Sequence, residues 1–146
     1  MQNKTILITG ATAGIGEVTA LELARTGATV VGVGRNPAKC AVVADRIRQA
    51  TGNPQVEFLI ADLAVQAQVR QLAADVCQKY DRLDLLINNA GAVFFQRQES
   101  ADGIELTWAL NHLNYFLLTH LLLDRLKASA PARIINVASD AHQGGK

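Results

Sequence analysis

The sequence has few cysteines, and their placement excludes several kinds of site. Cys40 and Cys77 lie far apart, form no C-x-x-C pair and have no histidine beside them. This spacing argues against a disulfide framework and against a metal site, and it favours buried thiols in a reducing compartment. We therefore expect a cytoplasmic protein without a bound metal.

An excess of charge and long apolar runs are absent as well. The 14 Lys and Arg residues and 13 Asp and Glu residues leave a net charge of +1, with no long basic block, so no nucleic-acid partner is expected. The apolar run near the amino end is too short for a signal peptide. The leucine-rich segment 113–123 contains polar residues and is too short to span a bilayer. No membrane span is expected.

The chain does have enough apolar residues for a core, at 49% of 146 residues, which suits one domain. Short β-branched runs alternate with longer amphipathic runs, and strongly apolar strands of this kind are typical of a parallel sheet covered on both faces. The fold class predicted is α/β, a doubly wound Rossmann-type sheet. Strands are expected over 4–9, 28–33, 56–60, 83–87 and 133–137, and helices over 14–26, 37–51, 65–80 and 102–128.

The most specific feature is a glycine-rich turn between the first strand and the first helix. Residues 9–16 read Thr-Gly-Ala-Thr-Ala-Gly-Ile-Gly, and such glycines allow a tight turn and a close approach of the backbone to a pyrophosphate. The spacing differs from G-x-G-x-x-G, so an ordinary glycine-rich turn is the alternative. The cofactor-binding residues expected here are Gly10, Thr12, Ala13, Gly14, Ile15 and Gly16.

The end of the second strand carries a cation where many dinucleotide folds carry a carboxylate. Arg35 follows Gly34 and precedes Asn36. An arginine at this place accommodates a 2′-phosphate, whereas a carboxylate binds the ribose hydroxyls of NAD. The sequence therefore favours NADP over NAD, although Ala13 offers no second cation. The alternative is an exposed loop arginine.

Polar residues also follow the third and fourth strands, at the edge of the sheet where such folds hold ligands. Asp62, followed by Leu63, could meet an adenine edge or could equally cap the helix expected to begin near Val65. The run Asn88-Asn89-Ala90-Gly91 follows the fourth strand. Its small residues allow a flat ligand to approach, and its amides can hold neighbouring strands together.

Two further polar residues occupy places that suggest chemistry. Asn111 lies inside a helical pattern, where a buried amide is costly unless it has a partner. Ser139 is expected to close the fifth strand at the ligand edge of the sheet. A satisfied core asparagine and an ordinary serine at a strand end are the alternatives.

Taken in order, the motifs at 9–16, 62–63, 88–91, Asn111 and Ser139 resemble the short-chain dehydrogenase/reductase family over the whole chain, and most of all its retinol-dehydrogenase-like branch. The resemblance implies hydride transfer between a nicotinamide cofactor and a small-molecule alcohol or carbonyl. It implies that Ser139 polarises the carbonyl and that Asn111 holds a water of a proton relay. The cofactor would contact Asp62, Leu63, Asn89, Ala90 and Gly91, besides the glycine turn, Arg35 and Asn36.

The Tyr-x-x-x-Lys motif that supplies the acid and base of this family does not follow Ser139. General acid–base catalysis needs such a group near the reacting oxygen. Only five of the six strands of the 3-2-1-4-5-6 order are present. We therefore expect 1–146 to be the amino-terminal part of a longer NADP-dependent oxidoreductase, inactive alone, with an open edge at its fifth strand. The alternative is a stand-alone, non-catalytic dinucleotide-binding or regulatory module. The helix at 102–128 could form a homo-oligomer face or could equally be core.

Overall fold

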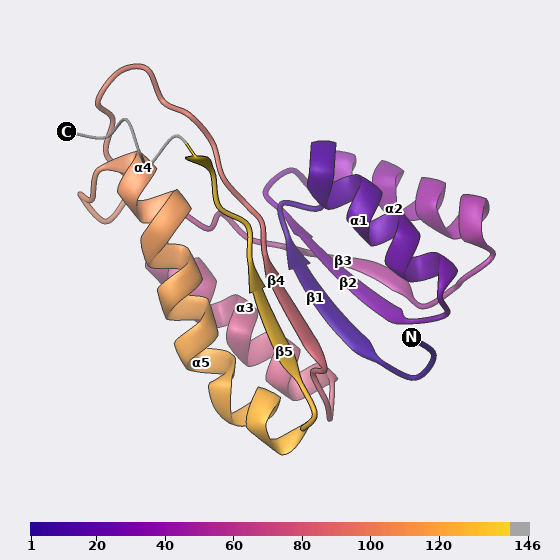
Figure 1. The fold of residues 1–146 in the computed structure, drawn as a ribbon. Helices are drawn as coiled ribbons and strands as arrows, with labels where there is room; N and C mark the ends of the chain where they lie inside the picture. Colours follow the sequence, from indigo (N-terminus) through magenta and orange to yellow (C-terminus); the bar gives the residue numbers. More distant parts are fainter. Residues whose placement is uncertain (141–146) are drawn as a thin grey trace.

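The computed structural model describes residues 1–140 and has a single parallel sheet with helices on both faces (Figure 1). The strands are β1 (Thr5–Thr9), β2 (Thr29–Gly34), β3 (Val56–Ile60), β4 (Leu85–Asn88) and β5 (Arg133–Asn136). The helices are α1 (Gly14–Arg25), α2 (Pro37–Thr51), α3 (Gln66–Lys79), α4 (Leu106–Trp108), the π-helix η1 (Ala109–Leu113) and α5 (Asn114–Ala128).

The sheet has the strand order β3-β2-β1-β4-β5, and every neighbouring pair is parallel. This confirms the expected doubly wound fold class and the first five strands of the Rossmann order. Since the strands are parallel, their carboxyl ends all meet at one edge of the sheet. The segments that follow β1, β2, β3 and β4 are therefore neighbours in space.

Two hydrophobic cores lie on opposite faces of the sheet. Leu7 of β1 packs in the core that contains residues of α3 and α5, whereas Ile6 and Ile8 belong to the core under α1 and α2. All three side chains are fully buried. This explains the apolar run of β1, because successive residues of a strand face opposite sides and here both sides are covered.

The prediction of one helix over 102–128 was wrong in two respects, because the helix begins later and is not α-helical throughout. Gly103 adopts a left-handed φ of 72°. The Glu105 carboxylate then accepts hydrogen bonds from the N–H groups of Thr107 and Trp108, which begins the helix at Leu106. A π-helical turn over Ala109–Leu113 interrupts the α-helix before it continues to Ala128.

The fifth strand forms one edge of the sheet, as expected. All four residues of β5 are exposed, including Ile134 and Ile135.

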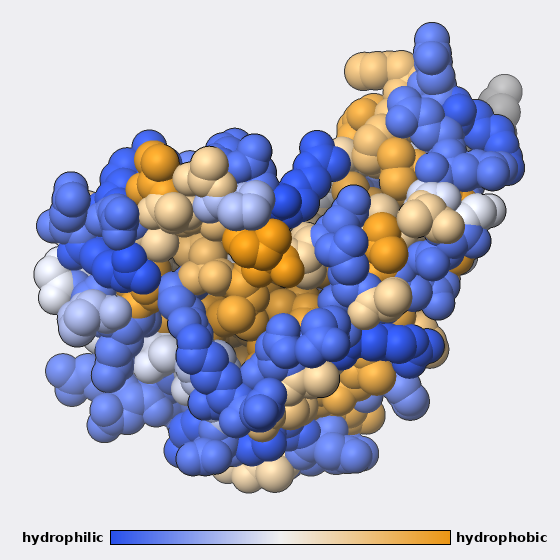
Figure 2. Space-filling view, turned by 180° about the vertical axis from the view of Figure 1, so that it is seen from behind, coloured by the Kyte–Doolittle hydropathy of each residue, from blue (hydrophilic) through white to orange (hydrophobic). Residues whose placement is uncertain are grey.

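Seen from behind, polar surface covers both flanks of the molecule and hydrophobic surface gathers near its middle (Figure 2). Within residues 1–140, no helix is both long enough and apolar enough to cross a membrane.

Candidate cofactor-binding site

The turn between β1 and α1 depends on glycine for two separate reasons. Gly10 has a left-handed φ of 67°, and a Cβ atom added to it would lie 2.8 Å from the Cα of Ala90. A Cβ atom on Gly16 would lie 2.3 Å from the Gly10 carbonyl oxygen. The turn is therefore packed tightly against the loop after β4 and against the start of α1.

The amino end of α1 is available to an anion. Its N-cap residue, Ala13, makes no side-chain capping hydrogen bond, so the first N–H groups of the helix have no side-chain acceptor at the cap. The acidic residue of the first turn, Glu17, is paired with Arg46. A Cβ atom on Gly14 would meet nothing within 4 Å. The open space there and the uncapped helix start fit a pyrophosphate group, which binds helix N-termini of this kind.

Thr9 and Asn89 hold this turn to the end of β4. The buried Thr9 hydroxyl accepts hydrogen bonds from the N–H groups of Asn89 at 2.9 Å and Ala90 at 3.0 Å. The Asn89 side chain donates to the carbonyl oxygens of Thr9 at 2.9 Å and Gly10 at 3.3 Å. The expectation that these amides hold neighbouring strands is confirmed, whereas the part of Thr9 was not foreseen.

These segments line a cleft of ≈ 640 Å³ at the carboxyl edge of the sheet. It brings together nearly all the residues expected to bind a cofactor. The cleft-lining residues among them are Gly10, Thr12, Ala13, Ile15, Gly16, Arg35, Asn36, Asp62, Leu63, Asn89, Ala90 and Gly91. Gly14 lies exposed beside it at the start of α1.

Two cations line the cleft beyond the end of β2. Arg35 and Lys39 are both exposed, and among the described residues neither side chain forms an ion pair. The Asn36 side chain accepts a hydrogen bond from the Lys39 N–H at 3.0 Å and so caps α2. Lys39 was not predicted, because position 13, occupied by Ala13, was the only other place considered for a second cation. Its place in the first turn of a helix that starts at Pro37 was the available signal.

Asp62 does not cap the helix that follows it. Its Oδ1 atom accepts a hydrogen bond from the Ala64 N–H at 3.0 Å, which closes a turn before α3. The N-cap position belongs to Val65, which has no side-chain cap. The capping alternative was therefore wrong, and Asp62 lines the cleft from a turn.

Asn111 is not the buried amide that the helical pattern predicted. It is exposed and lies in the π-helix η1. Its side chain donates to the Ala92 carbonyl oxygen at 2.8 Å and accepts from the Ala92 N–H at 2.9 Å. Both ends of the amide are thus engaged with the loop after β4, and this pairing fixes the loop where it lines the cleft.

Ser139 does not close the fifth strand. β5 ends at Asn136, and the last ladder hydrogen bond runs from the Val137 N–H to the Asn88 carbonyl oxygen, where β4 itself ends. Ser139 is exposed in the segment beyond, and Val137 rather than Ser139 lines the cleft. The expected position at the strand end was therefore wrong.

Both cysteines are free, but only Cys40 is buried as expected, whereas Cys77 is half-buried. Cys40 is buried, and burial raises the pKa of its thiol despite the nearby Lys39. Among residues 1–140, no group of three or more His, Cys, Asp and Glu side chains could hold a metal ion.

Comparison with known proteins places this geometry in a family. The family model of short chain dehydrogenases matches residues 4–145. Human retinol dehydrogenase 13 is 47% identical over 142 residues, which cover 97% of this chain and 43% of that protein. Human retinol dehydrogenase 11 is 44% identical over 146 residues, which cover 100% of this chain and 46% of that protein. The chain therefore spans less than half the length of these relatives.

Solved structures agree with the sequence relatives. The NADP active-site complex of RhlG from Pseudomonas aeruginosa has a TM-score of 0.83 and 35% identity, covering 95% of this chain and 56% of that one. A short chain dehydrogenase from Escherichia coli complexed with NADPH has a TM-score of 0.85 and 31% identity, covering 100% of this chain and 62% of that one. With its glycine turn, parallel sheet and cleft, this chain belongs to the short chain dehydrogenase family.

Proposed function

We propose that the intact protein is an NADP-dependent oxidoreductase that interconverts an alcohol and a carbonyl by hydride transfer. The observation that carries the proposal is the cleft at the carboxyl edge of the sheet, which joins the glycine turn to Arg35. The two solved relatives described above, which contain NADP or NADPH, support the choice of cofactor.

Two regions of this chain bind different parts of the cofactor. The uncapped start of α1 binds the pyrophosphate through backbone N–H groups. Arg35 and Lys39 bind a 2′-phosphate, because arginine offers a planar fork of donors and lysine a second positive charge. When bound, the nicotinamide supplies or accepts the hydride.

Ser139 and Asn111 are proposed to act on the substrate beside the cleft, although neither is among the residues that line it. Ser139 polarises the carbonyl oxygen through its hydroxyl. Asn111 serves a proton relay while its side chain holds the loop at Ala92. The reaction also needs an acid and a base, and these 146 residues do not contain the Tyr-x-x-x-Lys motif that the resemblance assigns to that role.

The substrate is proposed from the similarity of this chain to retinol dehydrogenases. Because human retinol dehydrogenases 11 and 13 share 44% and 47% identity with this chain, retinol and retinal are the first alcohol and aldehyde to test. The exposed residues Val93 and Phe95 follow the cleft-lining loop after β4 and present apolar surface to such a substrate.

The test measures carbonyl-dependent oxidation of NADPH by the intact protein, which is monitored as the fall in NADPH absorbance. We expect turnover with an aldehyde, and a reduction of kcat by about 10²-fold in Ser139→Ala, since one lost oxyanion donor costs about that much. Ser100→Ala, in the loop before α4, is the matched control and should keep full activity. Saturable NADPH binding without turnover of any carbonyl would instead favour the non-catalytic binding module.

A further inference from the structure

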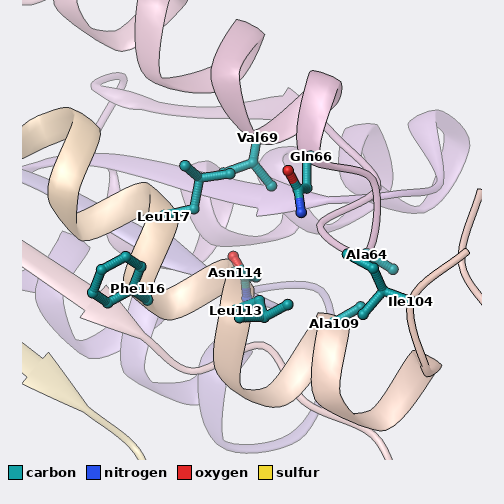
Figure 3. Close-up of a pocket in the computed structure, with 9 residues that line it drawn as sticks. All are labelled: Ala64, Gln66, Val69, Ile104, Ala109, Leu113, Asn114, Phe116 and Leu117. Atoms are coloured by element: carbon teal, nitrogen blue, oxygen red, sulfur yellow. The ribbon is translucent and has the colours of Figure 1, made fainter. Parts of the chain in front are cut away.

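A second, smaller cavity lies between α3 and the η1–α5 helix. It measures ≈ 120 Å³ and is lined almost entirely by apolar side chains (Figure 3). The residues around it are Ala64, Gln66, Val69, Ile104, Ala109, Leu113, Asn114, Phe116 and Leu117. Phe116, one of these residues, is 67% exposed.

One strong acceptor in this cavity has no partner. Asn114 is 2% exposed, and its amide nitrogen donates to the Leu110 carbonyl oxygen at 3.0 Å within the helix. Its Oδ1 atom is buried and accepts no hydrogen bond from the described residues. In Figure 3 this oxygen points into the space bounded by Leu117, Val69 and Gln66. An unpaired buried acceptor is costly, so a donor placed there is stabilised.

The cavity is separate from the cofactor cleft, although only a thin wall divides them. The two share no lining residue. The wall is formed where Leu63 lines the cleft and Ala64 the cavity, and again where Leu110 lines the cleft and Ala109 the cavity. A ligand in the cavity therefore contacts neither the glycine turn nor Arg35.

The shape and polarity of the cavity suit an organic molecule better than a water cluster. At about 30 Å³ per water, the volume corresponds to about four waters, each needing about two to four polar partners. The walls offer only the amides of Asn114 and Gln66. A cavity of about 150 Å³ takes benzene, and this cavity of ≈ 120 Å³ is only a little smaller.

We propose that this cavity is a binding site for a small, largely apolar molecule that carries one hydrogen-bond donor, such as a phenol or a simple alcohol. The donor is directed at Asn114 Oδ1, and the apolar body packs against Val69, Leu113 and Leu117. This site does not depend on the proposed oxidoreductase activity.

Phenol and toluene are the probes, because they have nearly the same shape and differ in the hydroxyl group. In titrations of the intact, isotope-labelled protein saturated with NADPH, phenol should shift the methyl resonances of Val69 and Leu113 saturably. Toluene should bind about tenfold more weakly, the ratio that one hydrogen bond of about 1.4 kcal/mol gives.

Substitution of Asn114 tests whether its amide oxygen causes the tighter binding of phenol. In Asn114→Leu, which keeps a branched side chain of similar size, phenol should lose its advantage and bind no better than toluene. Asp124→Leu, on the exposed side of α5, is the matched control and should retain the wild-type ratio. Equal affinities in the wild type, shifts confined to residues of the cofactor cleft, or no saturable shift would each overturn the proposal, and the wild-type comparison holds even if Asn114→Leu fails to fold.

Discussion

At the residue scale, the glycine turn is held in place by a few hydrogen bonds rather than by the glycines alone. Thr9 is fully buried, and its hydroxyl oxygen accepts hydrogen bonds from two backbone N–H groups of the loop after β4. Asn89 reaches back to the carbonyl oxygens at the end of β1. These bonds determine the distance between the two loops that form the floor of the cleft.

Thr9→Val should therefore destabilise the protein although the two side chains have nearly the same shape. The methyl group leaves the N–H groups of Asn89 and Ala90 without their acceptor, and we expect a loss of about 2 kcal/mol in the free energy of unfolding. Urea denaturation measures it. Thr19→Val on the exposed surface of α1 is the control and should change stability by less than about 0.5 kcal/mol. Equal effects of the two substitutions would contradict this role.

We propose that cofactor choice depends on Arg35, which lines the cleft beyond the end of β2. Arg35→Ala removes the donor fork, and we expect the NADPH dissociation constant to rise about 10- to 100-fold, as for a charge-assisted hydrogen bond of about 1.5–3 kcal/mol. The NADH constant should change by no more than about twofold. Isothermal titration calorimetry gives both values. Arg25→Ala, which removes a surface pair with Glu22, should leave both unchanged, and a parallel loss of NADH and NADPH binding in Arg35→Ala would argue against a 2′-phosphate contact.

At the element scale, the sequence predicted the elements that carry local boundary signals. The limits of α2 were predicted correctly, because Asn36 caps its start, Pro37 occupies its first turn and Gly52 ends it with a left-handed φ of 67°. The start at Leu106 was missed, because glutamate is not among the preferred N-cap residues, and Glu105 caps through its longer side chain.

Other errors had tertiary causes. The end of β5 follows from where its neighbour β4 ends, which the pattern of residues 133–139 does not contain. The engagement of Asn111 with Ala92 joins segments that the helical pattern treats separately. Lys39, in contrast, could have been found, because it lies in the first turn of a helix whose start at Pro37 was predicted correctly.

The amino ends of β1 and β4 are tied by a charged cluster. Asp84 is buried and accepts hydrogen bonds from Lys4, Arg82 and the Thr5 N–H. Burial by itself raises the pKa of this carboxyl, but the hydrogen bonds from Arg82, Lys4 and Thr5 outweigh burial and hold the pKa well below its usual value. The bonds therefore stabilise the folded state wherever Asp84 is ionised.

Asp84→Asn should lower the free energy of unfolding at pH 7 by about 2 kcal/mol. Because the folded-state pKa lies below the unfolded one, this difference from wild type should persist down to about pH 5. It should shrink as the pH falls below about 4 and towards the folded-state value. Urea denaturation across this range measures it, with Asp124→Asn on the exposed side of α5 as control. A difference that stays constant or grows on acidification would contradict the direction of the shift.

At the scale of the whole molecule, the parallel sheet brings four loops to one edge and leaves β5 open at the side. The glycine turn, the cations after β2 and the loops after β3 and β4 meet in one cleft, whereas both apolar residues Ile134 and Ile135 of β5 are exposed. The family was identified from the order of the motifs, and the strand order agrees with it. The predictions of a cytoplasmic location and of a homo-oligomer face on the helix at 102–128 stay untested.

The central claim is that this cleft binds NADP in preference to NAD. Titration of the intact protein with NADPH and NADH under the same buffer conditions, followed by nucleotide fluorescence, tests it most directly. We predict a dissociation constant for NADPH at least about tenfold below that for NADH, since Arg35 and Lys39, which line the cleft, are proposed to bind the extra phosphate. Equal constants, or tighter binding of NADH, would contradict it.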